Sequence, residues 1–123
     1  MRIGKKSYSC SPEGLKLMLA YVQQEILAAK LDMKKTMHIE IAVEEALTNS
    51  IRHSGLSVDD KISVKCELLE SGFCVMISDR GKPFNPLDNN VKGIGIALML
   101  RLMDAVHYQR KDEMNVLTLI KNR

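Results

Sequence analysis

The strongest constraint on the fold is the alternation of apolar and polar residues between positions 61 and 79. The apolar positions are Ile62, Val64, Cys66 and Leu68, followed after the turn Glu70-Ser71-Gly72 by Phe73, Val75 and Ile77. A period of two puts these side chains on one side of a strand, and two such strands joined by a short turn predict an antiparallel hairpin. One face of this hairpin is apolar, so we expect helices to cover it.

Two segments with helical periodicity precede the hairpin, and a third follows it. Ser11 is a suitable N-cap for the first helix, whose apolar residues recur every three or four positions. Asp32 is a suitable N-cap for a second helix over about 33–53. A mostly apolar stretch over 94–103 predicts the third helix.

Further strands are predicted near both ends of the chain, at 2–9 and in a second hairpin formed by 105–110 and 116–120. The predicted order is β-α-α-β-β-loop-α-β-β. The expected fold class is therefore α/β (α+β), a two-layer sandwich whose mixed, mostly antiparallel sheet is covered on one face by helices. With 123 residues and no break in composition, we expect a single domain, 1–123.

Composition argues against several classes of function. The net charge is only +3 and acidic residues are interleaved with basic ones, so nucleic-acid binding is not predicted. No stretch approaches the ~20 apolar residues of a membrane-spanning helix, and the first ten residues lack the apolar core of a signal peptide. The three cysteines, Cys10, Cys66 and Cys74, have no metal-binding spacing. We expect a cytoplasmic protein with reduced thiols and no membrane contact.

The predicted helix over 33–53 carries the first polar motif. Glu45 and Asn49 lie one helical turn apart, on the side opposite an apolar stripe that includes Val43 and Leu47. Such residues are also typical of the solvated face of an ordinary amphipathic helix. Their small and apolar neighbours favour a partly closed pocket, and a carboxylate near an amide oxygen suits a magnesium-phosphate site.

A second motif, Asp79-Arg80-Gly81, follows the predicted strand directly. Aspartate and glycine are common in ordinary turns. An aspartate at a strand end also accepts a hydrogen bond from an exocyclic amine, and Gly81 lets the backbone approach a flat base. The aperiodic loop from Asp79 to Lys92 therefore predicts a ligand contact of the kind that adenine provides.

The third motif, Gly93-Ile94-Gly95, opens the last predicted helix. The free amides and positive dipole end of a helix N-terminus hold phosphate oxygens well. Alone, this pattern indicates only a helix start, because Leu98 breaks the Rossmann pattern and the GxxxxGK pattern of the P-loop is missing. In combination with the other two motifs, it predicts a nucleotide phosphate site.

Together and in this order, the motifs resemble the N, G1 and G2 boxes of the histidine-kinase-like ATPase family, also called the Bergerat fold. The segments are EEALTNSIRHSG, ISDRGKPFNP and GIGIALMLRLMD, and they look most similar to those of bacterial anti-sigma factor serine/threonine kinases. The resemblance spans residues 11 to 120 and implies ATP and Mg²⁺ as cofactors.

The resemblance also implies roles for individual residues. Glu45 is expected to be the catalytic base, Asn49 a magnesium ligand and Asp79 the acceptor of the adenine amine. The other expected nucleotide-binding residues are His53, Gly81, Pro83, Lys92, Gly93, Ile94, Gly95 and Thr118, the last as a hydroxyl near the adenine. His53 has a second interpretation as a structural residue near a helix end, and Lys92 as a surface charge. The segment 87–92 is a short lid, so the resemblance does not establish that the lid closes tightly over the triphosphate.

The expected function is a regulatory serine/threonine kinase that phosphorylates a small anti-sigma factor antagonist protein and controls a sigma factor. The alternative is a nucleotide-gated protein-binding module that responds to ATP or ADP without phosphotransfer. An isolated sensor histidine-kinase ATPase domain is disfavoured, because no phospho-acceptor helix pair precedes the motifs. By resemblance, a homodimer formed through the amino-terminal strand and helix is a further expectation.

Overall fold

A computed structural model of the protein describes residues 2–88 and 93–123. The elements, in chain order, are β1 (Arg2–Ser9), α1 (Pro12–Ala29), α2 (Met33–His53), β2 (Lys61–Leu69), β3 (Gly72–Asp79), α3 (Ile94–Leu102), β4 (Ala105–Lys111) and β5 (Met114–Asn122). This order of strands and helices is the predicted one.

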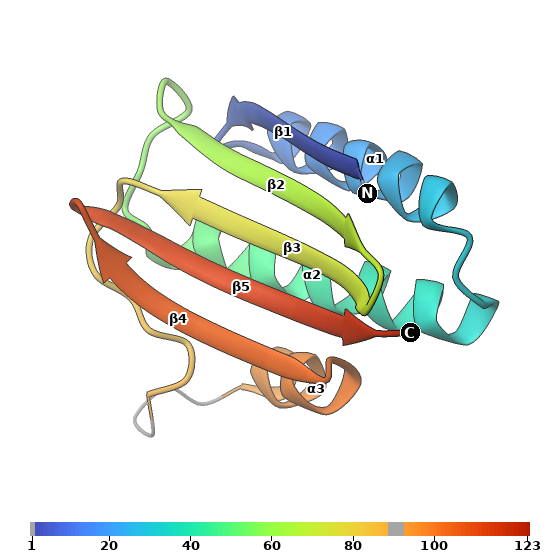
Figure 1. The fold of residues 1–123 in the computed structure, drawn as a ribbon. Coiled ribbons are helices and arrows are strands. Elements are labelled where there is room, and N and C mark those ends of the chain that lie inside the picture. The colour runs from blue at the N-terminus through green and yellow to red at the C-terminus, as the bar shows by residue number, and fades with distance from the viewer. Residues whose placement is uncertain (1, 89–92) are drawn as a thin grey trace.

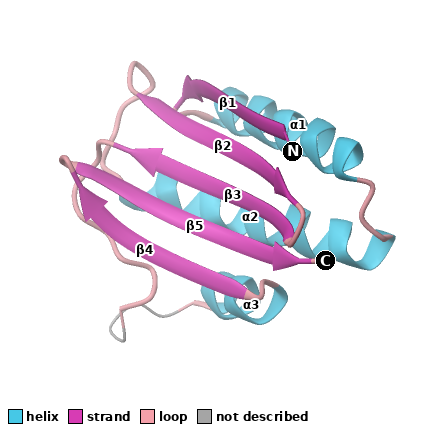
Figure 2. Ribbon diagram, in the orientation of Figure 1, coloured by secondary structure: helices cyan, strands magenta, loops and turns pink. Residues whose placement is uncertain are grey.

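The five strands form one sheet in the order β1-β2-β3-β5-β4, and the helices lie together on one of its faces (Figures 1 and 2). Every pair of neighbouring strands is antiparallel. The predicted two-layer α+β sandwich is confirmed. The sheet was expected to be mixed and mostly antiparallel, whereas all of its described strand pairs are antiparallel. Such a sheet has only one helix-covered face, on which the core must form.

Local signals at the helix ends act as the sequence predicts. The Ser11 hydroxyl accepts a hydrogen bond from the Gly14 amide at the start of α1, and the Asp32 carboxylate accepts one from the Lys35 amide at the start of α2. After α2, Gly55 takes the left-handed conformation, with φ +72°. None of the helices in the described part of the chain has the length and apolarity needed to span a membrane.

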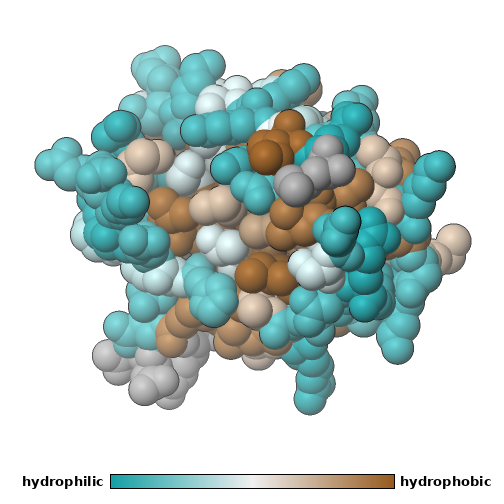
Figure 3. Space-filling model, viewed as in Figure 1, coloured by the Kyte–Doolittle hydropathy of each residue, from teal (hydrophilic) through white to brown (hydrophobic). Residues whose placement is uncertain are grey.

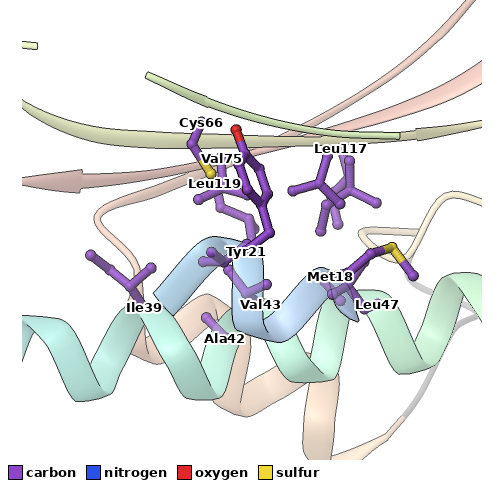
Figure 4. Close-up of a cluster of buried hydrophobic side chains, with 14 of the residues drawn as sticks. Met18, Tyr21, Ile39, Ala42, Val43, Leu47, Cys66, Val75, Leu117 and Leu119 are labelled. Carbon is purple, nitrogen blue, oxygen red and sulfur yellow. The ribbon is translucent and has the colours of Figure 1, made fainter. Parts of the chain in front are cut away.

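The core lies between the helices and the sheet (Figure 4). Its fully buried side chains come from all three helices and from the central strands, and include Met18, Val22, Ile26, Ile39, Val43, Leu47, Ile62, Val64, Phe73, Ile77, Met99 and Leu119. The three cysteines are buried and free, as predicted. Burial raises the pKa of the Cys66 thiol to about 12, which keeps it protonated.

The other face of the sheet carries no helix, and it is the face turned to the viewer in Figure 3. Apolar residues gather in its centre and hydrophilic residues surround them. Strand register places Met76, Thr118 and His107 side by side in one row across β3, β5 and β4. Because side chains alternate along a strand, this row faces away from the row that holds Ile77 and Leu117 in the core.

Candidate functional site

A cavity lies between the helix layer and the sheet, where β3 ends. The space between its walls, counted together with the part that is open solvent, is about 400 Å³. Its walls are formed by Ala46, Asn49, Ser50, Ser54, Ile77, Asp79, Phe84, Pro86, Met99, Tyr108, Asn115 and Leu117. A concave space with mainly apolar walls and a few convergent polar groups is typical of a small-molecule site.

Asp79 is the buried acid of this cavity, with only 4% of the residue exposed. Its Oδ1 atom accepts hydrogen bonds from the Gly81 amide at 2.9 Å and from Asn115 Nδ2 at 3.0 Å. Within residues 2–88 and 93–123, nothing donates a hydrogen bond to Oδ2. The second carboxylate oxygen is therefore left for a ligand donor, as an acceptor of the adenine amine requires.

The loop after Asp79 is fixed by backbone contacts around Gly81. The carbonyl of Gly81 accepts a hydrogen bond from Arg110 at 2.7 Å, and the next amide, that of Lys82, donates to Ser54 O at 2.9 Å. A Cβ at Gly81 would lie only 2.5 Å from Ser54 O, so the close approach requires glycine. Pro83, one of the predicted ligand residues, is exposed and lies outside the cavity wall.

His53 supports the wall of the cavity and is not part of it. Its ring stacks on that of Phe84, with centroids 4.3 Å apart and planes 16° from parallel. Phe84 and Pro86 are the loop residues that line the cavity, although neither was among the predicted ligand residues. This geometry supports the structural interpretation of His53.

The sequence-based reasoning missed Asn115, which organises this end of the cavity. Its Nδ2 atom donates to Asp79 Oδ1 and, at 2.9 Å, to Lys82 O. Its Oδ1 atom accepts from the Phe84 amide at 3.2 Å and from the Tyr108 hydroxyl. These four bonds use every donor and the acceptor oxygen of the side chain, and they tie the loop, β3, β4 and β5 together.

Thr118, predicted to place a hydroxyl near the adenine, lies on the open face of the sheet. Along β5, Asn115, Leu117 and Leu119 are buried on the helix side, whereas Thr118 alternates with them and points the other way. Position 118 is therefore separated from the cavity by the sheet. The polar side chain of β5 that reaches Asp79 is Asn115, because strand register pairs these two residues directly.

Glu45, the predicted base, lies where α2 meets α3, and Asn49, the predicted magnesium ligand, lies one helical turn further along α2. Asn49 is in the cavity wall, and Glu45 is half-buried. A Cβ added at Gly95 would overlap Glu45 Oε2, so the backbone of α3 passes directly against this carboxylate. The structure thus brings Glu45 and Gly95 together, close to the cavity but outside its wall.

The start of α3 differs from the starts of α1 and α2. Its N-cap residue, Gly93, has no side chain with which to bond the first amides of the helix. Ile94, the first residue of α3, is 89% exposed, so its side chain points into solvent and only its backbone contributes to the start of the helix. Lys92 lies outside the described residues. Among the described residues, no side chain caps the first turn of α3, and amides in this position are of the kind that bind phosphate oxygens.

The residues present fit a magnesium ion that is held together with a nucleotide. Asn49 supplies an amide oxygen, a donor suited to Mg²⁺, and the carboxylate of Glu45 lies one helical turn away. Within the described ranges, no group of three or more His, Cys, Asp or Glu side chains is arranged to hold a metal ion by itself. Magnesium in nucleotide sites takes several of its ligands from phosphates and water, so a small protein donor set suffices.

Solved structures of other proteins share the fold. The crystal structure of the RsbU and RsbW domains of Rv1364c from Mycobacterium tuberculosis matches with a TM-score of 0.76 and 14% identity over 98% of this chain. The chain spans only 32% of that structure. The Acinetobacter baumannii histidine kinase AdeS matches with a TM-score of 0.58 and 14% identity, covering 99% of this chain and 68% of that one. At this identity the likeness concerns the fold alone.

The sequence comparison identifies the family. No curated protein matches the sequence. The model of the histidine kinase-like ATPase domain, however, matches residues 8–121, which is nearly the whole chain and contains all three motifs. That match agrees with the cavity, the buried acid at the end of β3 and the glycine-flanked start of α3. The chain therefore belongs to the histidine kinase-like ATPase family, whose domain implies ATP binding.

Proposed function

We propose that this protein is an ATP-dependent protein kinase that phosphorylates a serine or threonine hydroxyl of a small partner protein. The observation that carries the proposal is the position of Glu45, a carboxylate held against the start of α3 and one helical turn from a cavity-lining amide, Asn49. A nucleotide whose base occupied the cavity and whose phosphates met the start of α3 would extend towards this carboxylate.

In this proposal, the two halves of the site bind different parts of ATP. Asp79 Oδ2 accepts the adenine amine, and the fixed loop at Gly81 lies alongside the base. The free amides at Gly93 and Gly95 hold phosphate oxygens. Asn49 would hold Mg²⁺, which neutralises charge on the phosphates when bound.

Glu45 would act on the acceptor hydroxyl. Phosphoryl transfer passes through a loose transition state, so the protein mainly needs to position the reactants and stabilise charge. A carboxylate beside the phosphates can orient the hydroxyl of the partner and take up its proton as the new oxygen–phosphorus bond forms. This use explains why an acid lies half-buried where α2 meets α3.

The regulatory subtype is the finer part of the proposal. The three boxes resemble those of anti-sigma factor kinases, and the matched structure from Mycobacterium tuberculosis contains an RsbW domain. We infer that the substrate is an anti-sigma factor antagonist-like protein and that the kinase controls a sigma factor in the cytoplasm, where ATP is available. The predicted homodimer belongs to the same proposal.

The test is phosphotransfer by Glu45→Gln, with Glu44→Gln as its matched control. Glu44 is the preceding acid on α2 and is exposed, so its substitution removes the same charge without changing the residue against Gly95. With labelled ATP, Mg²⁺ and candidate antagonist proteins, Glu45→Gln should transfer label about 10²- to 10⁴-fold more slowly. Nucleotide affinity should change little. Transfer at the wild-type rate by Glu45→Gln would remove Glu45 from the role of base.

A second candidate function, nucleotide-gated binding without transfer, is favoured by one feature. The start of α3 is uncapped, and α3 packs along α2, so phosphates bound there would bias the position of the whole helix. The comparison that separates the two functions is partner affinity with ATP against ADP, measured beside the transfer assay. A clear difference without transferred label would favour the gated module, and equal affinities without transfer would exclude it.

A further inference from the structure

We propose that Asn115, supported by a hydrogen bond from Tyr108, is the positioning residue that makes the cavity selective for adenine. This inference rests on the proposed ATP site and goes beyond it by naming what sets the orientation of Asp79. Neither Asn115 nor Tyr108 belongs to the three motifs, which end before β4 begins.

The pairing of strands brings the two side chains together. Asp79 is the last residue of β3, and the register of β3 and β5 places it directly opposite Asn115. Both residues are buried, at 4% and 7% exposure, and both face the helices. The 3.0 Å bond from Asn115 Nδ2 holds Asp79 Oδ1 in place. Oδ2, the other oxygen of the same carboxylate, then has a fixed position as well. The direction of Oδ2 is therefore determined by β5.

The neighbours of Asn115 determine which end of its amide faces Asp79. The Tyr108 hydroxyl and the Phe84 amide both donate to Asn115 Oδ1, so the oxygen must point towards them. The NH₂ group then points to Asp79 and to Lys82 O. A flipped amide would set its oxygen against two acceptors, Asp79 Oδ1 and Lys82 O, and its NH₂ group against the Phe84 amide, which can only donate. The amide therefore has a single orientation in this network.

The orientation matters because an acceptor at Oδ2 distinguishes between purines. Adenine presents an exocyclic amine, purine riboside presents only hydrogen at that position, and hypoxanthine presents a carbonyl oxygen that cannot donate. A hydrogen bond to a buried carboxylate should favour ATP over purine riboside triphosphate by on the order of tenfold to a hundredfold. The ratio of the affinity for ATP to that for purine riboside triphosphate depends on the direction of Oδ2, because hydrogen bonds weaken steeply when they are misaligned.

Other polar groups of the wall do not hold Asp79 in this way. The Ser54 hydroxyl accepts from the Leu56 amide and lies 3.9 Å from the Cys10 thiol. In the described part of the chain, the side chain of Asp79 is bonded only by Asn115 and by the Gly81 amide. The Gly81 bond is local to the turn, so Asn115 is the contact that links Asp79 to the rest of the sheet.

The test compares the affinities of ATP and purine riboside triphosphate for four proteins. These are wild type, Asn115→Asp, Tyr108→Phe and Thr118→Val, the last a matched control on the open face of β5. Asn115→Asp keeps the shape of the side chain and places a carboxyl oxygen against Asp79 Oδ1. The two acids can share the site only with a proton between them, so discrimination should be retained at acidic pH and lost as the pH rises.

Tyr108→Phe should lower the ratio by roughly threefold at every pH, because one of the two donors to Asn115 Oδ1 is lost. Thr118→Val should behave as wild type. The thermal midpoint without nucleotide shows whether each variant is folded. The proposal is overturned if Asn115→Asp keeps the wild-type ratio of the two affinities at every pH. It is also overturned if Asn115→Asp and Tyr108→Phe each weaken the binding of both nucleotides equally, because that result indicates that the two residues only support the fold. A wild-type protein that binds neither nucleotide instead refutes the proposed function itself.

Discussion

The two ends of the candidate site are built in different ways. The end proposed to bind the base, here the base end, consists of Ser54, Asp79, Gly81 and Asn115, and its groups are bonded to one another and to neighbouring strands. The phosphate end consists of Glu45, Asn49, Gly93 and Gly95, and there the start of α3 has no side-chain cap. The base end is therefore held together before any ligand arrives, whereas at the phosphate end no side chain of the described residues caps the start of α3.

In the proposed function, this difference follows from what each end would recognise. A flat, uncharged base offers only a few directional hydrogen bonds, so its partners must be held in place beforehand. Phosphates carry charge and bring Mg²⁺ with them, and several backbone amides can share their oxygens. We expect substitutions at the base end to affect folding and binding together, and substitutions at the phosphate end to affect chemistry with little effect on folding.

The comparison of Gly81→Ala with Gly93→Ala should show the largest difference. At Gly81, a methyl group would meet the Ser54 carbonyl at 2.5 Å and Asp79 Oδ1 at 2.9 Å, both of them fixed atoms. Overpacking of this kind should lower the free energy of unfolding by about 2 to 3 kcal/mol and weaken ATP binding at the same time. Chemical denaturation with a parallel nucleotide titration measures both effects.

Gly93→Ala is the matched control in this experiment. A Cβ at Gly93 would have no heavy atom of the described residues within 4 Å, and the φ of 169° is extended backbone that alanine adopts freely. Its free energy of unfolding should stay within about 0.5 kcal/mol of wild type. If both variants were equally unstable, the base end would not be more rigid than the phosphate end, and the comparison would fail.

Gly95→Ala should separate chemistry from stability at the phosphate end. Its methyl group would overlap Glu45 Oε2, which is the far end of a flexible side chain and can rotate away. Alanine is the better helix former by about 0.5 to 1 kcal/mol, so the protein should be as stable as wild type or slightly more so. Displacing the proposed base should slow phosphotransfer about tenfold to a hundredfold. Unchanged transfer would show that the contact between Glu45 and Gly95 does not matter for catalysis.

Much of the fold was predictable because its signals are local. Ser11 and Asp32 each act as the cap that their positions indicated, and α2 covers the predicted residues 33–53. The alternation over 61 to 79 gave the β2–β3 hairpin with the correct buried side. The three motifs likewise lie on α2, at the end of β3 and at the start of α3, because each contains its own helix or turn signal.

The partner of Asp79 was not predictable in the same way, because it depends on which face of β5 meets the helices. Val116 and Ile120 are as apolar as Leu117 and Leu119, so hydrophobicity alone gives no preference between the two faces. The helices cover the face with the two leucines, and Asn115 shares that face. A polar residue in phase with Leu117 and Leu119 was the one available signal. The stacking of His53 on Phe84 is likewise a tertiary contact without a local signature.

The two ends of α3 repeat the contrast at a smaller scale. At its far end, the carbonyl of Leu102 accepts a hydrogen bond from Lys121 Nζ at 2.6 Å, and the same ammonium group lies 3.0 Å from His38 Nδ1 on α2. Lys121 is 8% exposed, so this contact is largely buried. It ties α3 to α2 and β5 at the end remote from the cavity, and it requires neutral His38, whose Nδ1 accepts the bond.

This contact gives the smallest predicted effect, a dependence of stability on pH. Burial and the nearby Lys121 and Lys34 lower the pKa of His38 below its usual 6.5, while Asp32 and Asp104 oppose the shift. The unfolded chain then binds a proton more readily than the folded protein, so stability is fully present above the ordinary pKa and is lost as the pH falls towards the lowered one. His38→Asn keeps an acceptor oxygen but does not titrate, so its unfolding midpoint should lose this part of the pH dependence. Because the contact lies far from Asp79, the preference for ATP over purine riboside triphosphate should not change in this variant, and a changed preference would show that the two ends of α3 are coupled to the base end.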